Sequence, residues 1–196
     1  MKLIIFALIS TFASSLFASD GDCIHTKNSF NCVKYVSNYD GDTVRVNIPG
    51  THPMFGNNAD VRVYGVDTPE LHPSKCKLNG RNAAAYKKCI QHRTCEKVKA
   101  KQAKEIVEYF LSEGKRIDLV DIDRGKYFRI VADIIVDEIS IRELLISWGL
   151  AVPYYGDTKQ QVNWCAPQRA IVKLSEEIER NKLEKKSKPK KWEVTE

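Results

Sequence analysis

The chain has 196 residues, of which 43% are hydrophobic and 29% are charged. A chain of this length can bury a real core, and we find no repeat, no second domain and no low-complexity linker, which excludes a repeat or multidomain architecture. The formal net charge is +6. This modest basic excess suits a polyanionic partner, although a similar excess is common in ordinary soluble proteins.

Residues 1–18 have the pattern of a secretory signal peptide. Lys2 provides the positive charge, an apolar run extends from Leu3 to Phe17, and small residues surround Ala18. The run is short for a membrane span, and a polar stretch follows it at once. We therefore expect cleavage near Ala18 and a secreted or periplasmic protein that does not associate with membranes. A retained N-terminal anchor is the alternative.

Six cysteines follow this signal, and they are Cys23, Cys32, Cys76, Cys89, Cys95 and Cys165. An even number of cysteines in an exported chain indicates disulfide bonds, but the sequence cannot choose among the pairings. A zinc site is the alternative, with ligands drawn from Cys76, Cys89, Cys95, His72 and His92. No Cys-x-x-Cys pair occurs, which disfavours zinc.

Alternating apolar residues predict five short β-strands. They cover residues 32–39, 43–48, 61–66, a segment that begins at Ile117, and 130–136. The Pro- and Gly-containing residues 49–60 are predicted to form a long turn. After the third strand we expect an insertion of residues 71–95, which holds three of the cysteines and a short helical patch around residues 83–90.

Three further helices are predicted after this insertion. Apolar residues at helical spacing over residues 100–111 predict an amphipathic helix. The sequence Ser-Ile-Arg-Glu at 140–143 is a capping box that begins a second helix. Pro167 can begin a last helix, which leads into a basic tail of residues 181–196.

The order of these elements indicates an α+β fold. Five short strands with a helix after the third suggest a five-stranded OB-type β-barrel with flanking helices, and such barrels often bind oligonucleotides. We expect the barrel domain to span residues 35–180, after an N-terminal segment of residues 19–34, and we expect a monomer without a stable protein partner.

The stretch of residues 61–70 holds several charged residues that could bind a ligand or take part in catalysis. Apolar residues alternate there with Arg62, which gives a strand with one apolar face and one charged face. Pro69 ends the strand, because proline cannot donate to a β-ladder. Asp67 and Glu70 therefore lie at one strand end beside Arg62, where such charges are costly unless a cation and an anion are bound. A plain strand terminator is the alternative for this stretch alone.

A second stretch, Tyr-Asp-Gly-Asp-Thr at 39–43, predicts a tight turn that leads into the second strand. By itself the turn is explained as a hairpin connection. If it lies next to Asp67, however, Asp42 and Asp67 offer hard oxygen atoms to one divalent ion, and Ca2+ prefers carboxylates, backbone carbonyls and water. A third, basic element is residues 125–129, where Arg129 lies on the polar side of a strand start.

Together these three elements resemble the staphylococcal nuclease (thermonuclease) family. The resemblance rests on the motif at 40–44, on Arg62 with the motif at 66–70, and on Lys126-Tyr127 followed by Arg129, in the same order. It extends from about Tyr35 to Trp192. It implies the same barrel fold and a secreted, Ca2+-dependent nuclease that hydrolyses DNA and RNA with little sequence preference and leaves 3′-phosphates.

The resemblance also implies roles for individual residues. The groups that would ligate Ca2+ are Asp42, Asp67 and the backbone carbonyl of Thr68. The catalytic side chains would be Glu70 as general base, with Arg62 and Arg129 on the phosphate. The side chains that would contact the terminal phosphate and the nucleotide are Lys126, Tyr127 and Tyr155. The chain departs from the family around Tyr155, and at Phe128, where a glycine is frequent.

An alternative from a different class is a non-catalytic OB-fold module that binds nucleic acid or protein. Such a module does not require two clustered aspartates, a glutamate and two arginines all together. The full set therefore favours the enzyme.

Overall fold

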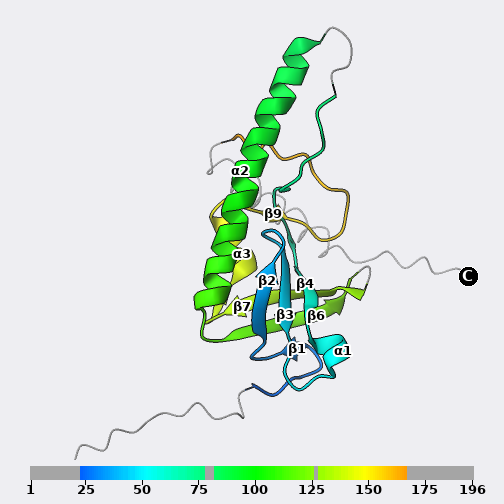
Figure 1. Cartoon of the computed structure of the whole chain (residues 1–196), viewed down its shortest axis with the longest axis vertical. Coiled ribbons are helices and arrows are strands. Elements are labelled where there is room, and N and C mark those ends of the chain that lie inside the picture. The colour runs from blue at the N-terminus through cyan, green and yellow to red at the C-terminus, as the bar shows by residue number, and fades with distance from the viewer. Residues whose placement is uncertain (1–22, 78–81, 126–127, 167–196) are drawn as a thin grey trace, which may run out of the picture.

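The computed structural model describes residues 23–77, 82–125 and 128–166. Within these ranges the chain forms nine strands and three helices (Figure 1). The strands are β1 (Ser29–Phe30), β2 (Lys34–Asn38), β3 (Thr43–Asn47), β4 (Ala59–Val63), β5 (Val66–Asp67), β6 (Ile117–Arg124), β7 (Ile130–Val136), β8 (Ile139–Ser140) and β9 (Val152–Pro153). The helices are α1 (Pro53–Gly56), α2 (Ala83–Glu113) and α3 (Ile141–Ser147).

The main sheet has the order β1-β6-β7-β4-β3-β2, with β8 beside β7. Its pairs are antiparallel except β4 and β7, which run parallel. The two end strands, β1 and β2, follow each other directly in the chain, so the sheet must curl to bring its ends together. At that junction the N–H of Val33 donates to the carbonyl of Ile117 at 2.8 Å. The α+β, OB-like fold expected from the sequence is thereby confirmed.

The third predicted strand, residues 61–66, is wrong as a single element. β4 ends at Val63, and the chain turns at Gly65, whose φ of +76° lies in the left-handed region that favours glycine. A Cβ atom at this position would also lie 3.1 Å from the ring of Tyr155. After the turn, β5 pairs with β9 instead of continuing in the main sheet. Asp67 therefore belongs to a separate two-stranded ribbon.

The helical patch at 83–90 and the amphipathic helix at 100–111 are also wrong as separate elements, because α2 is one continuous helix of 31 residues. Its N-terminus is capped by Asn82, whose side chain accepts a hydrogen bond from the Ala85 N–H. No glycine or proline interrupts the residues between the two predicted segments. Figure 1 shows α2 running along one side of the barrel and extending beyond it.

The core lies inside the barrel and under α2 and α3. Its fully buried large side chains include Val44, Val46, Val61, Val63, Val107, Leu111, Leu119, Ile134, Ile141 and Leu145. The predicted start of α3 is confirmed, since the Ser140 hydroxyl accepts a hydrogen bond from the Glu143 N–H. The predicted long turn at 49–60 contains the single helical turn α1, which Pro53 begins.

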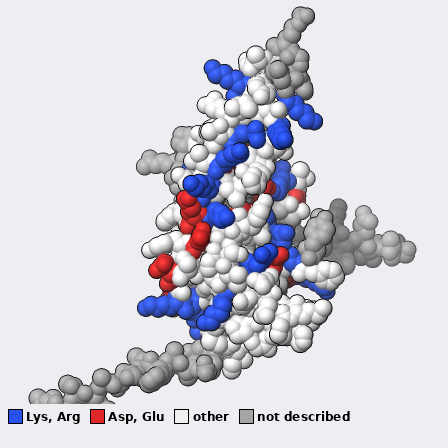
Figure 2. Space-filling model, viewed as in Figure 1, with Lys and Arg blue, Asp and Glu red and all other residues white. Residues whose placement is uncertain are grey.

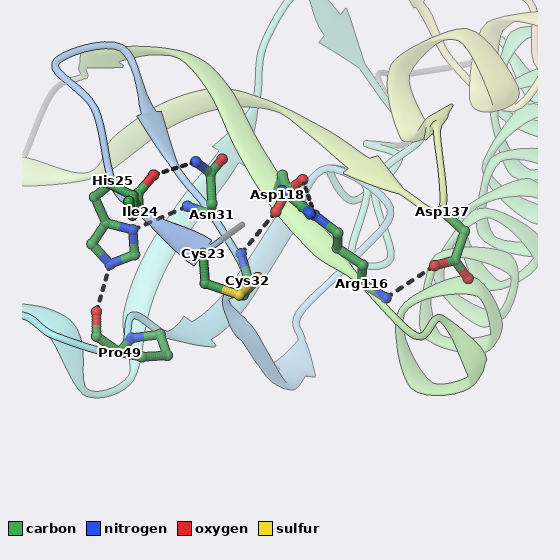
Figure 3. Close-up of a disulfide and its surroundings, with 9 residues drawn as sticks. All are labelled: Cys23, Ile24, His25, Asn31, Cys32, Pro49, Arg116, Asp118 and Asp137. Carbon is green, nitrogen blue, oxygen red and sulfur yellow. Dashed lines mark hydrogen bonds and ion pairs between the residues drawn. A yellow bond between two sulfur atoms is a disulfide. The ribbon is translucent and has the colours of Figure 1, made fainter. Parts of the chain in front are cut away.

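All six cysteines form disulfide bonds, which join Cys23 to Cys32, Cys76 to Cys89 and Cys95 to Cys165. The alternative of a zinc site is therefore wrong, because its cysteines are bonded to one another or to Cys165. Figure 3 shows the first bond at the β1 end of the barrel, where the Cys32 N–H donates to Asp118 at 2.7 Å. Three disulfides are typical of extracellular or periplasmic proteins.

Some of the sequence-based predictions concern residues outside the described ranges. They are the signal peptide at 1–18, Lys126 and Tyr127, the helix from Pro167 and the basic tail at 181–196. Among the residues that the structure does describe, no helix combines the length and apolar character needed to span a bilayer.

Candidate active site

Asp42 is brought to Arg62 by the register of β3 and β4, which aligns Thr43 with Arg62. The turn that carries Asp42 also packs closely against α2. A Cβ atom at Gly41 would lie 2.7 Å from the Ala103 Cβ and 3.0 Å from a methyl carbon of Thr68. The glycine of the Asp-Gly-Asp turn is therefore required for close approach, since a larger residue would push Asp42 away from Thr68.

The Asp42 side chain is buried and accepts four hydrogen bonds. Its Oδ1 accepts from Nη1 of Arg62 at 2.5 Å and from the Thr43 hydroxyl at 3.3 Å. Its Oδ2 accepts from the backbone N–H and the hydroxyl of Thr68, at 2.9 and 3.0 Å. Burial raises the pKa of Asp42 to about 7, and the Arg62 guanidinium opposes that rise only in part.

Asp67 and Glu70 both form ion pairs with the side chain of Lys159. Nη2 of Arg62 donates to Oδ1 of Asp67 at 3.1 Å. Nζ of Lys159 lies 2.9 Å from the same oxygen and 2.9 Å from Oε1 of Glu70. Burial lowers the pKa of Lys159, but the hydrogen bonds to Asp67 and Glu70 outweigh it, so the net direction is upward. Arg62 thus joins Asp42 to Asp67, and Lys159 extends the same network to Glu70.

A cavity of about 520 Å³ opens beside this network, lined in part by Arg62, Arg129, Tyr155 and Lys159. The parallel pairing of β4 and β7 aligns Arg62 with Val131, so Arg129, two residues earlier, shares its face. The Arg62 guanidinium is occupied by three acceptors. The Arg129 side chain makes no hydrogen bond or ion pair with a residue that the structure describes. Arg129 is thus free, among these residues, to bind an anion in the cavity.

Phe128, which precedes Arg129, has a φ of +60°. This is the left-handed conformation that a glycine adopts without strain and that costs other residues about 1–2 kcal/mol. The side chain is 83% exposed, and its ring stacks on Arg124 with 4.4 Å from the Arg124 Cζ to the ring centroid. The backbone therefore keeps the glycine-like shape in front of Arg129 although the residue differs from the family's frequent glycine.

Two residues at the site were missed by the sequence analysis. Lys159 lies in a polar segment without a motif, and its partner Asp67 is far away in the chain. Glu96 lies on α2, where its Oε1 accepts from the Glu70 N–H at 3.4 Å. The only signal that could have pointed to them is their closeness to Cys95 and Cys165, once these are known to be bonded.

The oxygen donors at this site fit a hard cation by their chemistry. In the part of the chain that the structure describes, no three His, Cys, Asp or Glu side chains are placed to share a metal. An ion would therefore rest on Asp42, Asp67, the Thr68 carbonyl and water. The Asp42 carboxylate already accepts about as many hydrogen bonds as it has lone pairs. It must therefore lose at least one of them to bind a metal ion. Oδ2 of Asp67 accepts no hydrogen bond from a described residue.

The comparisons with known proteins identify the family of this domain. Residues 60–169, more than half of the chain, match the family described as "Staphylococcal nuclease homologue". No curated protein matches the chain. The protein belongs to the staphylococcal nuclease family, and its barrel is a nuclease-like domain. Asp42 lies outside the matched residues, so its place at the site rests on its contacts with Arg62 and Thr68.

Proposed function

We propose that the protein is a secreted, Ca2+-dependent nuclease that hydrolyses phosphodiester bonds in DNA and RNA with little sequence preference and leaves 3′-phosphates. The observation that carries the proposal is the meeting of Asp42, Arg62 and Asp67 in one partly buried network, beside a cavity that Arg129 lines. The family acts on nucleic acids, which supports the choice of substrate.

Each residue has a proposed role that follows from its chemical groups. Asp42, Asp67 and the Thr68 carbonyl would hold Ca2+, which supplies positive charge to a phosphate oxygen when bound. Arg129 offers paired N–H groups that match the oxygens of a phosphate, which a lysine cannot do, and Arg62 would add the N–H groups that Asp42, Val66 and Asp67 leave unused.

Glu70 is the proposed general base. Its side chain is 52% exposed, so water can reach it, and it is not one of the proposed metal ligands. A carboxylate in this position takes the proton of the attacking water and is worth ~10^2–10^4 in rate. Tyr155 lines the cavity and is proposed to contact the nucleotide, with Lys126 and Tyr127.

Digestion of DNA and RNA in the presence of Ca2+ or of a chelator, followed by end-group analysis, tests the proposal. We expect cleavage of both nucleic acids with Ca2+, loss of cleavage after chelation, and products with 3′-phosphates. Activity that survives exhaustive chelation, or that only zinc restores, contradicts the assignment.

A Glu70→Gln variant tests the role of the base. It is expected to retain Ca2+ binding, weakened only by the loss of one nearby negative charge, and to lose ~10^2–10^4 in turnover, because the proton acceptor is removed. Glu105→Gln is the matched control, since Glu105 is an exposed residue of α2 that pairs only with Lys101 among the described residues. Near-native turnover of a folded Glu70→Gln protein would exclude Glu70 as the base.

The ion pairs of Lys159 favour a second candidate function. Asp67 and Glu70 both pair with this lysine, as carboxylates do in a structural network. The corresponding function is that of a non-catalytic module that binds nucleic acid. It predicts binding of DNA or RNA by a gel-shift assay with no cleavage under any divalent cation.

A further inference from the structure

Lys159 reaches the candidate site from a long connection. This connection, residues 154–166, leaves β9 and returns to α2; we call it the strap. It contains no helix or strand, and all its residues are described. From its middle, Lys159 extends to Asp67 and Glu70 at 2.9 Å each, with its side chain half-exposed. One residue of an irregular segment therefore contacts both a proposed metal ligand and the proposed base.

The strap is fixed at its far end by three kinds of contact. The disulfide between Cys95 and Cys165 bonds it covalently to α2. Nε2 of His92 donates to the Val162 carbonyl at 2.8 Å. Val162 and Trp164 are buried in a small apolar cluster that also includes Cys95. These anchors hold the strap against α2, and they lie only a few residues from Lys159.

The charges of the network show what Lys159 contributes. When all three carboxylates are ionised, Asp42, Asp67 and Glu70 are neutralised in part by Arg62 and Lys159, which leaves a formal charge of −1. Without Lys159 the formal charge is −2. A divalent cation is attracted more strongly by the second arrangement, because Coulomb energy grows with the product of the charges.

Arg62 and Lys159 differ in how they are held. Arg62 projects from β4 on the face opposite the buried Val61 and Val63, and it bonds to Asp42, Val66 and Asp67 at once. Lys159 comes from the strap, which lies outside the barrel strands and which the bond to Cys95 holds together with the His92 hydrogen bond and the apolar cluster. The contribution of Lys159 can therefore be withdrawn without disturbing the barrel.

We propose that Lys159 is a built-in counter-ion that the Cys95–Cys165 disulfide holds at Asp67 and Glu70, where it lowers the affinity of the site for a divalent cation. This inference rests on the proposed function, because it takes Asp67 as a cation ligand. Its consequence is that the state of a disulfide sets the metal affinity of the site. Lys159 is a positioning residue in this account, since it orients two carboxylates and does not itself react.

Isothermal titration of Ca2+ into the native protein and its variants measures the effect without any substrate. Lys159→Met is expected to bind Ca2+ about tenfold more tightly, because the competing charge is gone. Lys159→Arg retains the charge and is expected to stay close to the native Kd. Lys101→Met is the matched control, because Lys101 is an exposed lysine of α2 that pairs only with Glu105 among the described residues.

A disulfide variant tests the second half of the proposal. Replacing both Cys95 and Cys165 by serine is expected to tighten Ca2+ binding in the same direction. Adding Lys159→Met to this variant should produce no further gain, because both changes act through the same ion pair. The control replaces both Cys23 and Cys32 by serine, which breaks the disulfide at the β1 end of the barrel (Figure 3) and should leave the Kd unchanged.

The results separate this inference from the proposed function. If the native protein binds Ca2+ and cleaves DNA, but Lys159→Met has a Kd within twofold of native, the inference alone is overturned. The same holds if Lys101→Met tightens binding equally. If neither the native protein nor Lys159→Met binds Ca2+, both this inference and the proposed Ca2+ dependence of the nuclease are contradicted. Thermal melting confirms folding, and Lys159→Met decides the question should the disulfide variant not fold.

Discussion

The two parts of α2 are held in place by different interactions. Residues 100–113 contain all the buried residues of the helix, which are Ala100, Ala103, Val107 and Leu111. Residues 83–99 contain none. Instead, disulfides at Cys89 and Cys95 bond this first part to residues 76 and 165, in the segments that carry Glu70 and Lys159. One part is thus a core element, while the other is a projecting arm that covalent bonds fasten.

The charges of the two parts differ as well. Residues 83–99 carry five basic and one acidic side chain, whereas residues 100–113 carry two basic and three acidic ones. Figure 2 shows Lys and Arg side chains over the upper part of the molecule, where the arm lies, and acidic side chains gathered lower down. A helix whose face does not pack into a core can carry this charge at little cost, since its side chains stay in water. The arm therefore leaves most of its surface in water, whereas the core part buries one face and exposes only the other.

The largest expected effect is on the core part. Leu111→Ala should lower the free energy of unfolding by about 2–5 kcal/mol, because Leu111 is 2% exposed and its loss leaves a cavity. Val98→Ala, at a position in the arm that is 53% exposed, should change stability by no more than about 0.5 kcal/mol. Chemical denaturation of both variants measures this difference. Equal losses would show that the arm is packed as tightly as the core part.

The next largest effect is expected from the Cys95–Cys165 disulfide. Its replacement by two serines should cost about 2–4 kcal/mol, because the bond closes a long loop of the unfolded chain. Amide hydrogen exchange is expected to accelerate more in residues 83–99 than in residues 100–113, because the arm loses a local anchor in addition to the loss of global stability. Uniform acceleration along α2 would contradict the division of the helix into two parts.

A smaller effect is expected on nucleic-acid binding. Under the proposed function, replacing Lys88 and Lys97 in the arm by glutamine should weaken DNA binding. The slope of log affinity against log salt should become shallower by about 1–2, because each lysine that neutralises a phosphate releases roughly one counterion. Lys115→Gln, beyond the other end of α2, is the control. The measurement is fluorescence anisotropy at several salt concentrations. Indistinguishable slopes for the arm variant and the native protein would remove the arm from the binding surface.

The smallest effect is expected where the core part of α2 ends. Asp137 accepts hydrogen bonds from the backbone N–H groups of Lys115 and Arg116, at 3.0 and 2.9 Å, and these lower its pKa from 3.8. A carboxyl with a lowered pKa in the folded state adds stability above pH 3.8, which is lost as the pH falls through the folded-state pKa. Asp137→Asn should therefore flatten the dependence of stability on pH in the acid range.

Asparagine is a suitable replacement, because the φ of +46° at Asp137 is one that asparagine tolerates. Thermal melting of both proteins at several acid pH values measures the effect. A pH dependence that is unchanged by the substitution would show that Asp137 does not carry it.

Much of the fold and of the central cluster could be predicted from the sequence. The five barrel strands follow from alternation of apolar residues, which depends only on neighbours in the chain. The strand end at residues 61–70 predicts Arg62 beside Asp67, whereas the approach of Asp42 was only a condition that the family resemblance implied. The β3–β4 hairpin brings Asp42 to Arg62. The start of α3 was predicted from a cap, which is also a local signal.

The tertiary structure decided what depends on distant contacts. That α2 is one continuous helix could not be predicted from the spacing of apolar residues, because the arm has no apolar face. The break at Gly65 follows from the pairing of β5 with β9, far along the chain. The disulfide pairing, and with it the position of Lys159 between Asp67 and Glu70, required three-dimensional proximity. Local signals determined which chemical groups the protein has, and long-range packing decided which of them meet.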